Sequence, residues 1–184
     1  MGHKAAQQIV VAELLTCLRL NSSVRSPNEM TPAINIVRKN KITHKIHEYA
    51  HNPSRDSYGL EASQKLGVPE NQVFKTLIVN LDNRELAVGI IPVSSMLNMK
   101  LIARVAGAKM AVMANQSDVE RSTGYVLGGV SPLGQKKRLK TFIDSSSASF
   151  STVYVSAGRR GLEIELSPDD LIKLLNGELA ELCQ

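Results

Sequence analysis

The sequence predicts an α+β domain in which helices lie outside a mixed β-sheet. Segments with helix-capping residues are interspersed irregularly with apolar, strand-like segments, and two apolar runs meet at Asp82-Asn83 as in a hairpin. The chain has 184 residues, of which 43% are hydrophobic and 21% charged, which is enough for one sizeable core. This irregular alternation favours a mixed sheet over a regular parallel α/β fold.

The working domain is expected to span residues 30–184, with residues 1–29 as an N-terminal extension and linker. An apolar, helix-like stretch at 9–18 is followed by a polar segment that contains Pro27. Glu13 interrupts the apolar stretch, which argues against a signal peptide. A regulatory or dimerising helix is the alternative interpretation of this extension.

In the first half of the domain, two predicted helices flank a strand and a hairpin follows. Thr31 is a predicted N-cap with Pro32 at the first helical position, and Gly67 is a predicted C-cap for the second helix. The predicted segments are a strand at 41–49, a helix at 58–66 and a hairpin at 73–93.

In the second half, Ser94 or Ser95 is expected to cap a helix that Gly107 ends. Ser167 is expected to cap the last helix, because Pro168 and two acidic residues follow it. Between these helices the sequence predicts a short strand, a short helix or turn, and three more strands, at 109–113, 115–124, 140–144, 152–156 and 161–166.

Composition excludes several classes of protein. No stretch approaches the roughly 18 consecutive apolar residues of a membrane helix. The two cysteines, Cys17 and Cys183, give no disulfide framework and no metal-ligand spacing, so a reducing cytoplasm is the expected location. The four histidines lack the partners of a metal site, and neither a metal nor a cofactor is expected.

Positive charge is concentrated in one region. The chain carries a formal net charge of +5, and residues 133–161 alone contribute six basic residues against Asp144. The basic residues are Lys136, Lys137, Arg138, Lys140, Arg159 and Arg160. Such a concentration favours a polyanionic partner, although a solubilising face is the alternative.

Two segments and one lysine are candidates for chemistry. Lys75 is placed by strand parity on the same face as Leu77 and Val79, either serving a ligand or extending to water from the strand edge. Residues 128–134 contain three glycines and Pro132, which suit either an ordinary turn or a cradle of backbone N–H groups. Residues 156–161 suit a hairpin turn that adds two arginines. No protein nucleophile and no acid–base pair is evident.

Several quoted segments together resemble the YbaK family, free-standing relatives of the editing domain inserted in prolyl-tRNA synthetases. The segments are "MTPAINIVRKNKI", "VFKTLIV", "STGYVLGGVSPLGQKKRLKTFID" and "VYVSAGRRGLEIELSPDDL". The resemblance runs from about Met30 to the C-terminus and implies a compact α+β fold with a curved, barrel-like sheet. Residues 1–29 have no counterpart in the family pattern.

The resemblance implies roles for individual residues. The essential lysine of the family falls on Lys75, and its substrate loop falls on Gly128, Gly129 and Pro132. Substrate-binding positions fall on Tyr49, Ser156 and Ser131. The expected tRNA contacts are Lys136, Lys137, Arg138, Arg159 and Arg160.

The implied activity is removal of cysteine from mischarged tRNA(Pro) by a trans-acting deacylase without a cofactor. The substrate's own thiol would attack the ester, so that no protein nucleophile is needed. Choice of tRNA is expected to depend on a synthetase partner, prolyl-tRNA synthetase. The alternatives are an Ala-tRNA(Pro) deacylase of the same superfamily and a non-catalytic tRNA-binding module.

Overall fold

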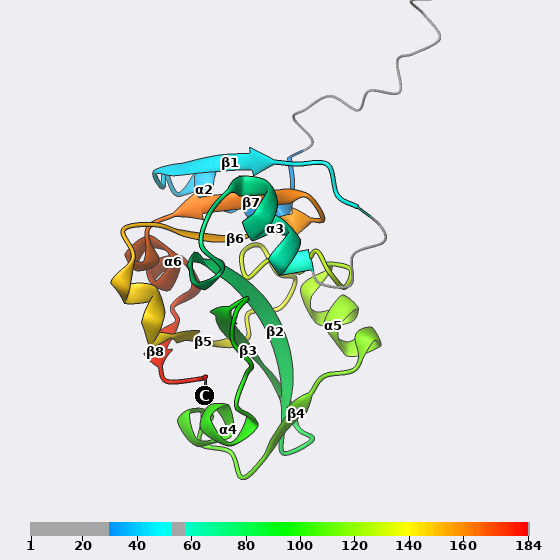
Figure 1. Ribbon diagram of the computed structural model, residues 1–184. Coiled ribbons are helices and arrows are strands. Elements are labelled where there is room, and N and C mark those ends of the chain that lie inside the picture. The colour runs from blue at the N-terminus through cyan, green and yellow to red at the C-terminus, as the bar shows by residue number, and fades with distance from the viewer. Residues whose placement is uncertain (1–29, 53–57, 184) are drawn as a thin grey trace, which may run out of the picture. The chain divides into compact units, whose positions relative to one another are not determined.

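Eight strands form one mixed sheet (Figure 1). The computed structural model describes residues 30–52 and 58–183, so the predicted N-terminal extension and Cys17 lie outside the described residues. The strand order is β1-β7-β6-β2-β3-β5-β8, and β4 also pairs with β2. The strands are β1 His44–Glu48, β2 Val73–Leu81, β3 Glu85–Pro92, β4 Ala111–Met113, β5 Lys140–Asp144, β6 Val153–Arg159, β7 Leu162–Leu166 and β8 Glu178–Ala180.

The pairings confirm the predicted mixed sheet. The β2–β6, β3–β5 and β5–β8 pairs are parallel, and the β1–β7, β2–β3, β2–β4 and β6–β7 pairs are antiparallel. The predicted hairpin between β2 and β3 turns at Asp82 and Asn83, whose φ angles of 51° and 56° suit a tight two-residue turn. β8 was not predicted, because three residues are too few for an alternating pattern.

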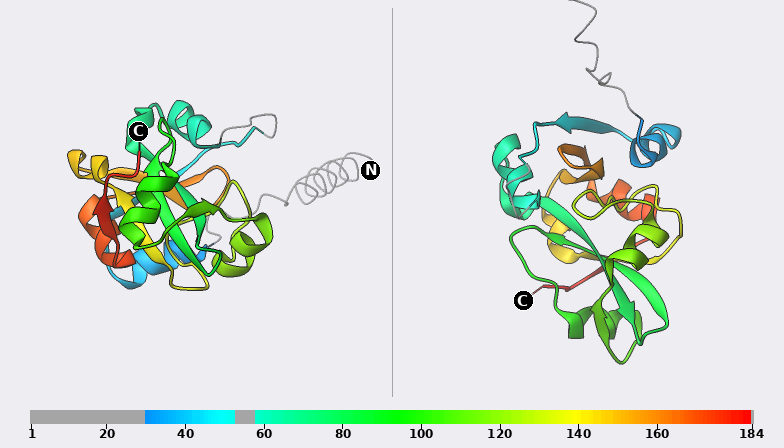
Figure 2. Two further views of the ribbon diagram at one scale, coloured as in Figure 1. Left: turned by 90° about the horizontal axis from the view of Figure 1, so that it is seen from below. Right: turned by 90° about the vertical axis from the view of Figure 1, so that its right-hand side faces the viewer.

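Five helices and two 3₁₀ turns accompany the sheet in the described part of the chain (Figures 1 and 2). Thr31 and Ser167 accept backbone N–H groups as the predicted N-caps of α2 and α6, and Gly67 has the expected positive φ after α3. The elements are α2 Pro32–Lys39, α3 Tyr58–Leu66, η1 Glu70–Gln72, α4 Met99–Ala106, α5 Gln116–Thr123, η2 Ser145–Ser149 and α6 Pro168–Leu175. None of these helices is long and apolar enough to cross a membrane.

The predicted start of α4 is wrong. Asn98, not Ser94 or Ser95, is the N-cap, and its side-chain oxygen accepts the N–H groups of Lys100 and Leu101. The chain before it cannot be helical because Leu97 is held in a β-bridge to Cys183. Tertiary pairing therefore delays the helix by one turn relative to the local capping signal.

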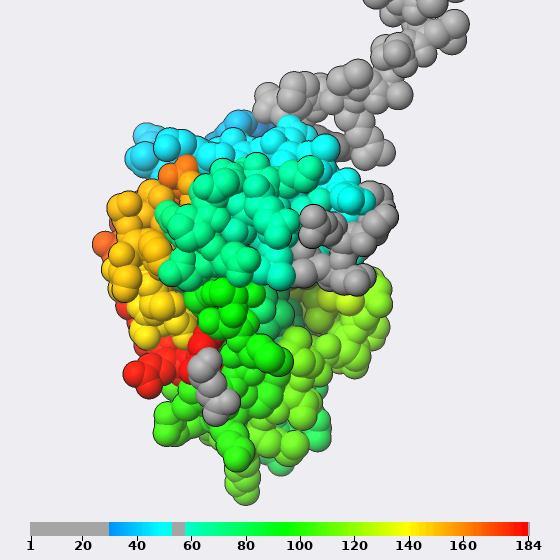
Figure 3. All heavy atoms as spheres, in the orientation of Figure 1, coloured from blue at the N-terminus to red at the C-terminus, as the bar shows by residue number. Residues whose placement is uncertain are grey.

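β2 separates two apolar clusters. Phe74 and Ile78 pack into the larger cluster, together with α2, β6 and β7, while Leu77 and Val79 pack into a second cluster with α4. The two faces of β2 therefore follow the predicted strand parity. α3 covers the front of the molecule between the β1 segment and α4 (Figure 3), and Ala62 of α3 packs in a third cluster with Val73 and Tyr154.

Candidate functional site

A cavity of about 290 Å³ opens at the edge of β2. On this edge β2 pairs with β6 at Val73 and Phe74, and with β4 at 79–81. Residues 75–78 lie between these two pairings and have no strand partner on this edge. Five consecutive residues, 73–77, line the cavity, so the site is built in a gap of the sheet.

The cavity brings together residues that are far apart in the sequence. Its lining includes the predicted site residues Tyr49, Lys75, Gly128, Ser156 and Arg160. They come respectively from the end of β1, from β2, from the loop after α5, from β6 and from the β6–β7 turn. The site therefore depends on the pairing of strands that are far apart in the sequence.

The other predicted loop residues do not line this cavity. Ser131 is fully buried, and its hydroxyl oxygen accepts the N–H of Leu133. Gly129 lies against the backbone of the β6–β7 turn, where an added Cβ would come within 3.1 Å of the Cα of Arg159. Pro132 lines a separate groove. These three residues shape the loop and do not face the cavity.

Backbone N–H groups of the loop divide into engaged and free ones. The Gly129 N–H donates to the Val126 carbonyl at 3.0 Å, and Pro132 has no N–H. Gly128 and Val130 both line the cavity, and within the described chain their N–H groups have no protein acceptor. Of the backbone N–H groups in this loop, those of Gly128 and Val130 are therefore the candidates to stabilise an oxyanion.

Lys75 lies in the part of β2 that borders the cavity. Its Nζ donates to the Val93 carbonyl at 3.3 Å, and the side chain is half-buried. Burial lowers the pKa of the Lys75 ammonium, partly offset by the nearby Cys183. A lysine with one weak backbone contact beside a cavity retains two donors for a phosphate or a ribose hydroxyl.

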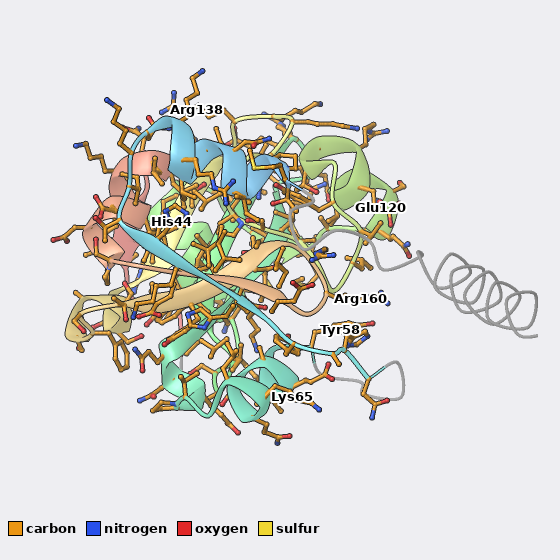
Figure 4. All side chains as sticks on the ribbon, turned by 90° about the horizontal axis from the view of Figure 1, so that it is seen from above. His44, Tyr58, Lys65, Glu120, Arg138 and Arg160 are labelled. Atoms are coloured by element: carbon orange, nitrogen blue, oxygen red, sulfur yellow. The ribbon has the colours of Figure 1, made fainter. Side chains whose placement is uncertain are left out.

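Arg160 fixes the loop over the cavity. Its guanidinium donates to the Leu127 carbonyl at 2.9 Å and lies 4.6 Å from the ring centroid of Tyr58 (Figure 4). Gly128 follows with φ of +84°, and a Cβ there would come within 2.5 Å of the Tyr58 ring. Glycine is therefore required at this position for both conformation and space.

The predicted tRNA-binding residues divide between two places. Lys136, Lys137 and Arg138 line the groove that contains Pro132, and Figure 4 shows Arg138 across the molecule from Tyr58 and Arg160. Arg159 is paired with Glu48 of β1 at 2.7 Å. Only Arg160 of the predicted basic set lines the cavity.

A His–Glu pair that was not evident from the sequence lies at the cavity. His51 lines the cavity, and its Nδ1 lies 2.6 Å from a carboxylate oxygen of Glu61 in α3. The other oxygen of Glu61 accepts the Asn52 N–H at 2.7 Å. Despite burial, these hydrogen bonds hold the pKa of Glu61 below its usual value. Ten residues separate the pair, too far for a helical or strand pattern to join them.

Glu163 of β7 is a second residue that the sequence pattern did not reveal. It lines the cavity and is 7% exposed, and burial raises the pKa of its carboxyl to about 8. Burial, together with Glu163 and Glu61, also raises the pKa of the Tyr49 phenol, which keeps it neutral. Glu163 and Glu165 alternate with apolar residues, a pattern that usually marks the solvent face of a strand.

Comparison with known proteins agrees with this architecture. Residues 52–174 match the aminoacyl-tRNA editing domain family. The chain is 34% identical over 159 residues to EbsC of Enterococcus faecalis, to which Cys-tRNA(Pro)/Cys-tRNA(Cys) deacylase activity is attributed; the match spans 86% of this chain and 96% of EbsC.

Two solved structures share the fold. One, described as a trans-editing enzyme for prolyl-tRNA synthetase, superposes with a TM-score of 0.74 at 20% identity, over 86% of this chain and 99% of that one. Hypothetical protein APE2540 superposes with a TM-score of 0.74 at 25% identity, over 83% and 99% of the two chains. On the family match and the EbsC identity, this chain belongs to the aminoacyl-tRNA editing domain family.

Proposed function

We propose that the protein is a trans-acting deacylase that removes cysteine from mischarged tRNA(Pro). The observation that carries this proposal is a cavity whose described residues provide a lysine and two free backbone N–H groups but no activated side-chain nucleophile. Ser156 lines the cavity, yet its hydroxyl contacts only the Gly158 N–H, at 3.3 Å, and no described imidazole or carboxylate is hydrogen-bonded to it. A substrate that supplies its own attacking group would fit this arrangement.

A substrate thiol fits this requirement. The cysteinyl sulfur attacks the ester carbonyl, the C–S bond forms and the bond from the acyl carbon to the ribose oxygen breaks. The thiol proton passes to that oxygen, and the products are a small thiolactone and tRNA. Attack within one molecule can lower the barrier by roughly 7–11 kcal/mol when the reacting atoms are held in place.

The described residues suggest roles in this reaction. The N–H groups of Gly128 and Val130 face the position of the developing oxyanion, and Lys75 holds the terminal ribose or a phosphate. Tyr49 and Ser156 line the part of the cavity that takes the aminoacyl group of the substrate. Gly129 and Pro132 act by shaping the loop and Ser131 by bracing it from within.

Two separate places on the protein bind tRNA in this proposal. Arg160 contacts the terminal nucleotides at the cavity, and the exposed groove residues Lys136, Lys137 and Arg138 contact phosphates farther along the acceptor stem. Phosphate contacts of this kind do not read sequence, so selection of tRNA(Pro) falls to a partner such as prolyl-tRNA synthetase. The setting for this reaction is the cytoplasm.

The test is ester loss from Cys-tRNA(Pro), Ala-tRNA(Pro) and an S-methylcysteinyl-tRNA(Pro) by the wild type and Lys75→Ala. We expect cleavage of the cysteinyl ester alone, and a loss of roughly 100-fold or more in Lys75→Ala. Lys140→Ala is the matched control, because Lys140 is also a strand lysine but pairs with Glu85 at 3.1 Å outside the cavity. Unchanged turnover of the S-methyl substrate would rule out thiol attack, and equal rates for Lys75→Ala and Lys140→Ala would remove Lys75 from the site.

A further inference from the structure

Glu163 is a buried acid without a partner. It lies in the middle strand of the β1-β7-β6 group, opposite His47 of β1 and Ser156 of β6. Within the described chain its carboxyl makes no hydrogen bond and no ion pair, although only 7% of the residue is exposed. A buried carboxyl in this position is costly unless it is neutral or meets a positive charge.

No described residue makes an ion pair with Glu163. Of the cationic residues that line the same cavity, Lys75 bonds the Val93 carbonyl, and Arg160 bonds the Leu127 carbonyl and stacks on Tyr58. Burial alone accounts for the raised pKa of Glu163, and no nearby cation opposes it. Among the described residues, Glu163 therefore has no counter-charge.

An aminoacylated 3′ end carries one group that can provide it. The phosphates are negative and the ribose and adenine are neutral at neutral pH, whereas the α-amino group of the aminoacyl moiety is the one group that can take up a proton and carry a positive charge there. Building on the proposed function, we propose that Glu163 binds the α-ammonium group of the substrate and makes the enzyme selective for aminoacyl esters with a free amine. Peptidyl and N-acylated esters are then excluded.

This contact also orients the reaction. The α-carbon carries the ammonium group, the ester carbonyl and the side chain. If Glu163 binds the ammonium group and the N–H groups of Gly128 and Val130 bind the carbonyl oxygen, the direction of the substrate side chain is fixed. A thiol in a fixed direction toward the carbonyl is what an intramolecular attack requires.

Glu165 provides a matched control two residues along the same strand. It is also 7% exposed and lies on the same face of β7, but it does not line the cavity. Its carboxylate already has three partners: His47 at 2.8 Å, Thr152 at 3.0 Å and Lys45 at 3.6 Å. Replacing Glu165 removes an equally covered carboxylate without touching the proposed amine site.

The experiment measures binding of two adenosine conjugates by calorimetry with the full-length protein. One carries L-cysteine through a stable 3′-amide, and the other carries 3-mercaptopropionic acid, which lacks only the amine. For the wild type and Glu165→Gln we expect the first to bind roughly 10- to 100-fold more tightly, as a charge-assisted hydrogen bond would give. In Glu163→Gln this difference should fall to less than about 3-fold.

Two results would overturn the inference: an amine preference that survives Glu163→Gln, or failure of both conjugates to bind the wild type. A parallel assay of ester loss from Cys-tRNA(Pro) keeps the two proposals apart. Amine-dependent binding through Glu163 without deacylation would support the inference and count against the proposed function. Deacylation with equal binding of both conjugates would do the reverse.

Discussion

Glu163 and Glu165 show how two residues of one strand acquire opposite properties. Both are 7% exposed on the same face of β7, yet burial raises the pKa of Glu163 to about 8, whereas hydrogen bonds from His47 and Thr152 overcome burial and lower that of Glu165. Glu163 has no cationic partner among the described residues, while Glu165 has three partners. The difference in pKa between the two carboxyls therefore follows from their partners and not from their exposed area.

The largest expected effect concerns the pH dependence of stability. Because the pKa of Glu163 is higher in the folded than in the unfolded chain, its contribution to stability is fully present below about pH 4.5 and is lost as pH rises toward 8. Glu163→Gln should therefore gain stability relative to the wild type across this window, by a few kcal/mol at pH 9. Urea unfolding at pH 5, 7 and 9 measures the gain.

Glu165→Gln should behave in the opposite sense. The lowered pKa of Glu165 gives stability that is present above about pH 4.5 and lost as pH falls through the folded value. The variant should be less stable than the wild type at pH 7, and the difference should shrink in acid. The comparison fails if both variants show the same pH profile.

A middle-sized effect is expected for His47, the shortest contact of Glu165. His47→Asn removes the 2.8 Å hydrogen bond and should cost about 1–2 kcal/mol at pH 7. The same substitution in a Glu165→Gln background should cost clearly less, since the two residues share one interaction. An equal cost in both backgrounds, measured by urea unfolding, would show that His47 stabilises the fold by packing on Tyr154 instead.

The smallest effect is expected for Lys45. Its side chain is 74% exposed and lies 3.6 Å from Glu165, so solvent screens the pair. Lys45→Ala should change the free energy of unfolding by less than about 0.5 kcal/mol, and added salt should remove the difference. A cost above that of His47→Asn would mean that Coulombic attraction, not hydrogen bonding, stabilises the Glu165 carboxylate.

The sequence predicted much of the fold because local signals were strong. Thr31 and Ser167 begin helices where capping chemistry places them, and the Asp82-Asn83 hairpin has the expected positive φ angles. The start of α4 could not be predicted, because the bridge between Leu97 and Cys183 joins residues 86 positions apart. Long-range pairing of this kind leaves no trace in local propensity.

The site was predictable only in part. Residue types with an evident use, such as Lys75 and Gly128, were identified, and the cavity contains both. Glu163 was missed because polar and apolar residues alternate along β7, as they do on a strand with one solvated face. The His51–Glu61 pair was missed because only the packing of α3 against the sheet brings Glu61 to His51. The sequence also could not show which N–H groups of the 128–134 loop are free, because this depends on the hydrogen bond from the Gly129 N–H to the Val126 carbonyl.

The order of strands in the sheet determines when the newly made chain can complete the β1–β7 pairing. β1 pairs only with β7 among the described strands, so the first strand made has to wait for residues 162–166 to leave the ribosome. Until then the backbone groups of β1 have no strand partner among the described strands. A chain released early would carry exposed strand edges that invite aggregation. The site therefore forms only after β7 has been made and has paired with β1.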